Sequence, residues 1–122
     1  MPRPSHFEIP VDDPGRAEKF YSEVFGWSFQ SYEGAPSYYG MATTGPDAET
    51  GINGALFQRG QTTVTTLTMS VDSIEDSLAK IVEKGGKVLQ AKTPIPTMGW
   101  YATCEDTEGN QFGLFTQDPG AA

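Results

Sequence analysis

The chain has 122 residues, of which 37% are hydrophobic and 20% are charged, so we expect a single folded domain over residues 1–122. A net charge of −8 argues against nucleic acid as a partner, because phosphate binding needs a basic surface. The negative charge suits a cationic small ligand, and the alternative is that it serves solubility alone. No apolar run reaches the ~20 residues of a membrane span, no signal peptide is evident and Cys104 is the single cysteine, so we expect a cytoplasmic protein with no membrane partner.

Residues 5–13 predict the first strand, because polar and apolar side chains alternate there. The apolar residues share one parity: Phe7, Ile9 and Val11. The other parity carries His6, the only histidine of the sequence, and Glu8. We expect a helix to follow at once, capped by Asp13 at its start and by Gly26 at its end.

The remainder of the first half predicts three more strands, over residues 27–32, 37–44 and 53–59. Residues 45–51 are rich in turn-forming types and predict a loop. Alternation places Tyr38 and Tyr39 on opposite faces of their strand, and the sequence does not tell which of them faces the sheet surface that would bind a ligand.

The second half begins with a strand over residues 64–71, and a helix follows that Asp72 or Ser73 caps. Three more strands are predicted over residues 87–92, 99–105 and 111–116. Prolines predict a loop at residues 93–97, since proline cannot donate a hydrogen bond inside a sheet. A hairpin turn is expected at residues 106–110 and a loose tail at residues 118–122.

The order strand–helix–three strands therefore occurs twice, and an offset of 60 residues superimposes the two halves. This offset pairs Phe7 with Leu67, Asp12 with Asp72, and Gly26 with Gly86. We expect an α+β fold of two βαβββ modules, module one at residues 5–59 and module two at residues 64–117. Each helix covers the apolar face of its own strands, so the more polar faces should line a cup-shaped mixed sheet with the helices outside.

The chain resembles the vicinal oxygen chelate (VOC) superfamily, which includes glyoxalases, bleomycin resistance proteins and extradiol dioxygenases. The resemblance is carried by HFEIPVDDPGRAEKFYSEVFGW at residues 6–27, by the paired module, and by GWYATCEDTEGNQFGLF at residues 99–115. It covers roughly residues 5–117 and implies a small-molecule ligand in the cup and a homodimer. The superfamily hosts several activities, so the resemblance leaves the reaction open.

Metal-using members of this superfamily place a ligand near the start of the first strand and on the last strand of each module. The resemblance maps these positions onto His6, Ala55, Thr66 and Gly113, of which only His6 is a competent ligand. His6 and Glu8 could supply two ligands at most, whereas a catalytic divalent metal usually needs about three. We therefore expect no metal cofactor; if a divalent metal binds, His6 and Glu8 would hold it.

The sharpest candidate site is the pair His6 and Glu8, in which His6 would donate a hydrogen bond or accept a proton while Glu8 fixes its tautomer or meets a cation. The competing interpretation is a histidine near solvent beside an ordinary carboxylate. Further candidates would line the cup with hydroxyl, aromatic or small side chains: Ala55, Phe57, Thr66, Thr68, Trp100, Tyr101, Gly113 and Phe115. Trp100 and Tyr101 stand on opposite faces of one strand, so only one of them can face the cup.

Three hypotheses follow for the function. The first is a metal-independent small-molecule-binding protein of the glyoxalase and bleomycin resistance type. The second is an enzyme, a metal-dependent lyase, isomerase or dioxygenase with a degenerate metal site around His6 and Glu8. The third is an interaction module whose cup is filled by side chains and whose sheet edge pairs with a partner chain.

Overall fold

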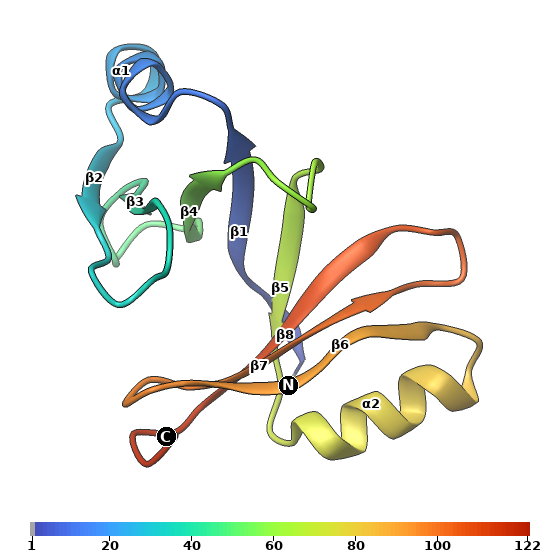
Figure 1. The fold of residues 1–122 in the computed structure, drawn as a ribbon. Coiled ribbons are helices and arrows are strands. Elements are labelled where there is room, and N and C mark those ends of the chain that lie inside the picture. The colour runs from blue at the N-terminus through green and yellow to red at the C-terminus, as the bar shows by residue number, and fades with distance from the viewer. Residues whose placement is uncertain (1) are drawn as a thin grey trace. The chain divides into compact units, whose positions relative to one another are not determined.

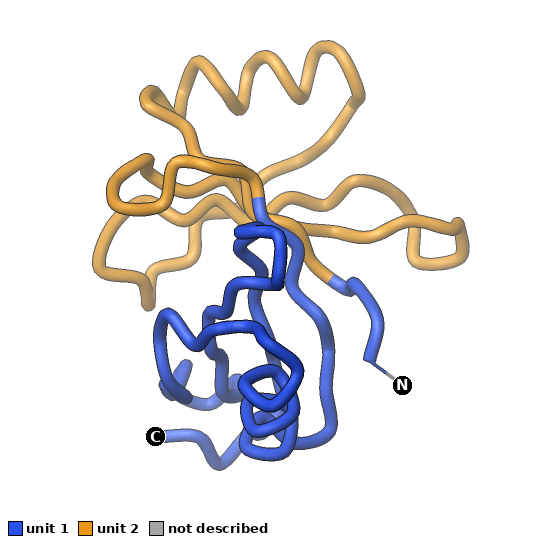
Figure 2. The backbone as a smooth tube through the Cα atoms, turned by 90° about the vertical axis from the view of Figure 1, so that its right-hand side faces the viewer, with its two compact units in different colours: residues 1–5, 66–122 blue, residues 6–65 orange. Residues whose placement is uncertain are grey.

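A computed structural model describes residues 2–122, which fold into two compact units (Figures 1 and 2). One unit holds residues 6–65; the other holds residues 66–122 together with the described residues up to Ser5. Strand β1 (Arg3–Val11) contributes to both, and its start is tied to the second unit by a contact of 2.6 Å between the hydroxyls of Ser5 and Ser70.

The unit of residues 6–65 contains β1 from His6 onward, α1 (Pro14–Phe25), β2 (Ser28–Ser31), β3 (Tyr39–Thr43) and β4 (Asn53–Gln58). Its strands follow the order β2-β3-β4-β1, in which β4 runs parallel to β1 and antiparallel to β3. We call these strands the first sheet. The predicted helix caps are confirmed: Asp13 accepts a hydrogen bond from the backbone of Arg16, and Gly26 adopts the left-handed conformation with φ 75°.

The face of the first sheet that carries Phe7 packs under the aromatic side chains of α1 and its C-terminal end. The ring centroid of Trp27 lies 5.4 Å from that of Phe7 and 4.9 Å from that of Tyr21. Leu56 is fully buried on this face, in register with Ile9 of β1. The alternation predicted for β1 is confirmed, because Phe7 and Ile9 share the covered face and His6 and Glu8 take the other.

The second unit repeats this plan with β5 (Thr66–Ser70), α2 (Ile74–Glu83), β6 (Lys87–Ile95), β7 (Gly99–Glu105) and β8 (Gln111–Gln117). Its strands, the second sheet, follow the order β5-β8-β7-β6, with β5 and β8 parallel as β1 and β4 are. Ser73 caps α2 by accepting from the backbone of Asp76, and Gly109 turns the predicted hairpin at φ 83°. The α+β class and the βαβββ repeat are confirmed, whereas the cup and the single domain stay predictions.

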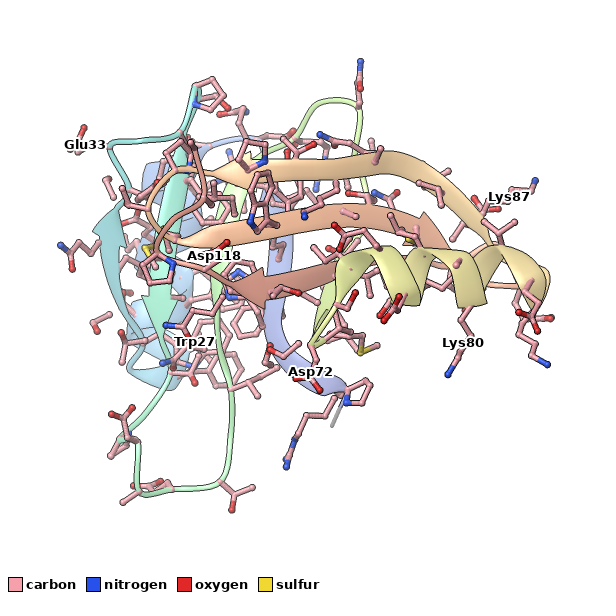
Figure 3. The ribbon with its side chains drawn as sticks, turned by 90° about the horizontal axis from the view of Figure 1, so that it is seen from below. Trp27, Glu33, Asp72, Lys80, Lys87 and Asp118 are labelled. Carbon is pink, nitrogen blue, oxygen red and sulfur yellow. The ribbon has the colours of Figure 1, made fainter. Side chains whose placement is uncertain are left out.

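The core of the second unit lies between α2 and one face of its sheet (Figure 1). Four buried residues form it: Ile74, Ala102, Cys104 and Leu114. Leu78 and Ile81 of α2 pack against this cluster, while Lys80 points away from the strands (Figure 3). The helix is therefore amphipathic, with one stripe buried and its charges in water. Among the described residues, neither α1 nor α2 is long and apolar enough to cross a membrane.

The loop predicted at residues 93–97 is wrong, because β6 continues to Ile95. Thr93, Pro94 and Ile95 pair with Tyr101, Trp100 and Gly99 of β7. Strand β6 lies at the edge of the strand order, with β7 on one side only. An edge strand tolerates proline, since its other side needs no backbone donor.

The loose tail predicted at residues 118–122 is also wrong. Asp118 accepts a hydrogen bond from the backbone of Gly120 at 2.9 Å, and the backbone of Ala121 accepts one from Thr97 at 3.0 Å. Ala121 is only 5% exposed. These bonds fold the end of the chain back against the turn between β6 and β7.

Candidate functional site

The face of the first sheet opposite α1 carries the residues singled out in β1. Strand register places Glu8 of β1, Ala55 of β4 and Met41 of β3 side by side, and pairs His6 with Asn53. Paired residues in a sheet point to the same face, so the predicted residues His6, Glu8, Ala55 and Phe57 share one surface. Phe57 pairs with Tyr39 of β3, which brings this tyrosine onto the same surface.

Three side chains on this surface form one hydrogen-bonded group, which we call the His6–Glu8–Tyr39 cluster. The hydroxyl of Tyr39 donates to Oε2 of Glu8 at 2.5 Å and lies 2.9 Å from Nε2 of His6. Nε2 of His6 and Oε2 of Glu8 are 3.8 Å apart, too far for a direct hydrogen bond. Tyr39 therefore connects His6 and Glu8, the two residues that the sequence predicted as a polar pair.

Burial controls the ionisation of this cluster. It lowers the pKa of His6, and the negative charge of Glu8 offsets only part of that change. It raises the pKa of Tyr39, to which the charge and the hydrogen bond of Glu8 add. At neutral pH His6 is thus an uncharged imidazole and Tyr39 a protonated phenol, so the cluster can accept protons or hydrogen bonds from a ligand.

Tyr39 was not among the predicted site residues, because the sequence did not distinguish its role from that of Tyr38. The structure separates the two side chains. Tyr38 donates to Oε2 of Glu18 on α1 at 2.5 Å, and so lies on the helix side. The register of β3 against β4 places Tyr39 on the same face as Ala55, so knowledge of that register would have identified Tyr39 as a site residue. The sequence does not determine the register, because a long loop separates the two strands.

The second sheet brings together most of the remaining predicted residues. Thr68 pairs with Gly113, and Phe115 pairs with both Ser70 and Tyr101. These side chains occupy the face opposite α2. Thr66 has the same parity in β5 and is 7% exposed.

Trp100 lies on the other face of the second sheet, so it is separated from Tyr101. It packs against the core cluster under α2 and donates its indole N–H to Asp118 at 2.9 Å. The amine of Lys92 stands 4.4 Å from the centroid of its ring, a cation–π contact. The two contacts and the core packing give Trp100 a structural role.

The donor set does not fit a catalytic divalent metal. Within residues 2–122, no group of three or more His, Cys, Asp or Glu side chains is arranged to hold a metal ion. The side chains of Ala55 and Gly113 carry no atom that could bind a metal. The two remaining candidates, His6 and Glu8, are both hydrogen-bonded to the hydroxyl of Tyr39.

Comparison with known families identifies one match that spans most of the chain. The family described as "Glyoxalase/Bleomycin resistance protein/Dioxygenase superfamily" matches residues 3–114. "Putative glyoxylase CFP32" of Mycobacterium tuberculosis is 27% identical over 118 residues, which cover 92% of this chain and 44% of that protein. A "Glyoxylase-like domain-containing protein" of Didymella fabae is 29% identical over 131 residues, covering 95% and 94%. The chain thus spans less than half the length of its mycobacterial relative.

Solved structures with the same fold have low sequence identity. A hypothetical protein from Bacillus halodurans superimposes with a TM-score of 0.75 at 14% identity, covering 100% of this chain and 99% of that one. Methylmalonyl-CoA epimerase from Mycobacterium tuberculosis gives 0.70 at 12% identity, covering 95% and 88%. The Streptomyces coelicolor epimerase in complex with 2-nitronate-propionyl-CoA gives 0.69 at 18% identity, covering 98% and 97%. At these identities the likeness concerns the fold alone.

Proposed function

Because this chain belongs to the Glyoxalase/Bleomycin resistance protein/Dioxygenase superfamily, we propose that it is a metal-independent protein that binds a small molecule. The observation that carries the proposal is the His6–Glu8–Tyr39 cluster, a half-buried polar group on the helix-free face of the first sheet. Polar side chains gathered on a surface of buried small and apolar residues are typical of ligand sites. Solved relatives of this fold bind small molecules, among them an epimerase in complex with methylmalonyl-CoA.

The proposed ligand contacts lie on the helix-free face of each sheet. In the first sheet the cluster supplies polar contacts and Phe57 supplies an apolar one, while Ala55 is fully buried beside Glu8. The second sheet offers hydroxyl, aromatic and small side chains: Thr66, Thr68, Tyr101, Gly113 and Phe115. Trp100 is not among the proposed contacts, because it packs against the core on the α2 side.

The chemistry of the donors supports the proposed metal independence. Two side chains, His6 and Glu8, could approach a metal, and the hydroxyl of Tyr39 already bonds both. A catalytic divalent ion usually takes about three protein ligands, so two side chains that are already hydrogen-bonded would bind it weakly.

Elemental analysis of protein purified without chelator tests this proposal. We expect less than stoichiometric zinc, iron, manganese or nickel in the wild type, and no change in His6→Ala or Glu8→Gln. Glu18→Gln is the matched control, because Glu18 also accepts a tyrosine hydroxyl at 2.5 Å but lies away from the cluster. A stoichiometric metal that His6→Ala or Glu8→Gln releases, and that Glu18→Gln retains, would overturn the proposal.

The second candidate is an enzyme of the same superfamily, a lyase, isomerase or dioxygenase with a degenerate metal site. The observation that favours it is an uncharged His6 held next to a carboxylate, an arrangement that general base catalysis uses. Titration with Mn²⁺ distinguishes the two candidates. Strong paramagnetic broadening of the His6 ring signals at one equivalent would support the enzyme, and unchanged signals would support metal-independent binding.

We also propose a homodimer in the cytoplasm. Phe20, Val24 and Phe25 of α1 are each more than half exposed, which is costly for a monomer in water. Cys104 is buried and unpaired, as in proteins of reducing compartments. Sedimentation equilibrium tests the dimer: the wild type should have twice the chain mass, and a monomer at all concentrations would contradict it.

A further inference from the structure

We propose that Tyr39 is a positioning residue that holds His6 as its Nε2–H tautomer, so that the cluster presents hydrogen-bond acceptors to its ligand. The inference rests on the proposed binding function and narrows the class of ligand. The hydrogen bonds of the cluster are limited by the protons that its three side chains can donate. Tyr39 has one hydroxyl proton and two neighbours within hydrogen-bond distance, Glu8 and His6.

The hydroxyl proton of Tyr39 goes to Glu8. An ionised carboxylate has no proton of its own, so the 2.5 Å contact requires Tyr39 to be the donor. The contact between the Tyr39 oxygen and Nε2 of His6, at 2.9 Å, then needs a proton on the nitrogen, because two lone pairs cannot bond. The reverse arrangement would require a neutral carboxylic acid at Glu8, whose side chain is 32% exposed to water.

Once the Nε2–H tautomer is fixed, Nδ1 of His6 carries a lone pair. Within residues 2–122, neither Nδ1 of His6 nor Oε1 of Glu8 has a hydrogen-bond partner in the protein. The ligand therefore meets two acceptor atoms and one negative charge. A planar amidinium or guanidinium, or an ammonium group, satisfies both acceptors and the charge, whereas a carboxylate or phosphate would be repelled. The net charge of −8 favours the same sign of ligand.

The chain provides a matched control in the neighbouring residue. Tyr38 donates to Glu18 at the same 2.5 Å, but no histidine takes part. Tyr38→Phe thus removes an equivalent hydroxyl from the residue just before β3 without touching the cluster. Tyr39→Phe leaves His6 without its acceptor, and Glu8 cannot replace it without moving, since it lies 3.8 Å from Nε2.

Nuclear magnetic resonance of ¹⁵N-labelled protein tests the positioning role, and the single histidine makes the ring signals unambiguous. We expect an exchange-protected Nε2–H proton and an unprotonated Nδ1 in the wild type and in Tyr38→Phe. Tyr39→Phe should lose that protected proton. An Nδ1–H tautomer in the wild type, or a protected Nε2–H that persists in Tyr39→Phe, would overturn the inference.

The ligand class is tested with two probes of equal size, benzamidinium and benzoate. Benzamidinium should shift the His6 ring signals of the wild type, and benzoate should shift them several-fold less. Glu8→Gln should keep the Nε2–H proton, since an amide oxygen still accepts from Tyr39, but should lose the benzamidinium response; Glu18→Gln should keep both. A larger response to benzoate would overturn the ligand class. No response to either probe would contradict the proposed binding function, while a protected Nε2–H would still support the role of Tyr39.

Discussion

The indole nitrogen of Trp100 donates a hydrogen bond to Oδ2 of Asp118 at 2.9 Å, which joins strand β7 to the segment after β8. The other oxygen of Asp118 accepts from the backbone of Gly120. Together these bonds lower the pKa of Asp118, the indole bond being the larger cause. The end of the chain is thus held by a carboxylate whose charged form is preferred.

Replacing Trp100 with Phe should raise the pKa of Asp118 towards its ordinary value. The variant removes the indole donor but keeps an aromatic ring against the core. A ¹³C-detected titration of the side-chain carboxyl measures the change. Trp27→Phe is the control, because Trp27 belongs to the other unit and packs against the rings of Phe7 and Tyr21. An unchanged Asp118 pKa in Trp100→Phe would contradict the assignment.

The same carboxylate predicts a pH dependence of stability. A carboxyl whose pKa is lower in the folded state stabilises the fold above its unfolded pKa, and this contribution is lost as the pH falls through the folded value. Between about pH 7 and pH 3, the wild type should therefore lose more of its free energy of unfolding than Asp118→Asn. Urea midpoints at both pH values measure the difference. Equal losses in the two proteins would show that Asp118 contributes nothing.

Gly54 marks a close approach of β4 to β1. A Cβ atom there would lie 2.4 Å from the backbone oxygen of Phe7 and 2.5 Å from its ring. We expect Gly54→Ala to lower the free energy of unfolding by about 1–3 kcal/mol, the usual cost of overpacking. Gly60→Ala is the control, because nothing lies within 4 Å of the added atom. A Gly54→Ala protein as stable as the control would show that β1 and β4 separate easily.

Ile74 anchors α2 in the core of the second unit and is 1% exposed. Ile74→Ala should lower the free energy of unfolding by about 2–5 kcal/mol, because it removes buried methyl groups and leaves a cavity beside Leu114 and Cys104. Val82→Ala, on the same helix but 58% exposed, should change it by less than about 0.5 kcal/mol. Chemical denaturation of both variants checks the ranking; equal costs would contradict the packing of α2.

The sequence alone determined the features that depend on neighbours along the chain. Asp13 caps α1 as predicted, and Ser73, one of the two predicted candidates, caps α2, because a cap is a bond between residues three apart. Gly109 turns its hairpin for the same local reason. The alternation in β1 placed Phe7 on the covered face, and the 60-residue repeat predicted the order of the elements in the second unit.

Only the tertiary structure decided the features that depend on strand order and register. Pro94 lies in a strand because β6 is at the edge of its sheet, which no local pattern reveals. Tyr39 joins His6 and Glu8 because β3 meets β4 in one particular register, across the loop between Thr43 and Asn53. A shift of one residue would have brought Tyr38 to that surface instead. The polar pair was therefore visible in the sequence, but the residue that connects it was fixed by long-range pairing.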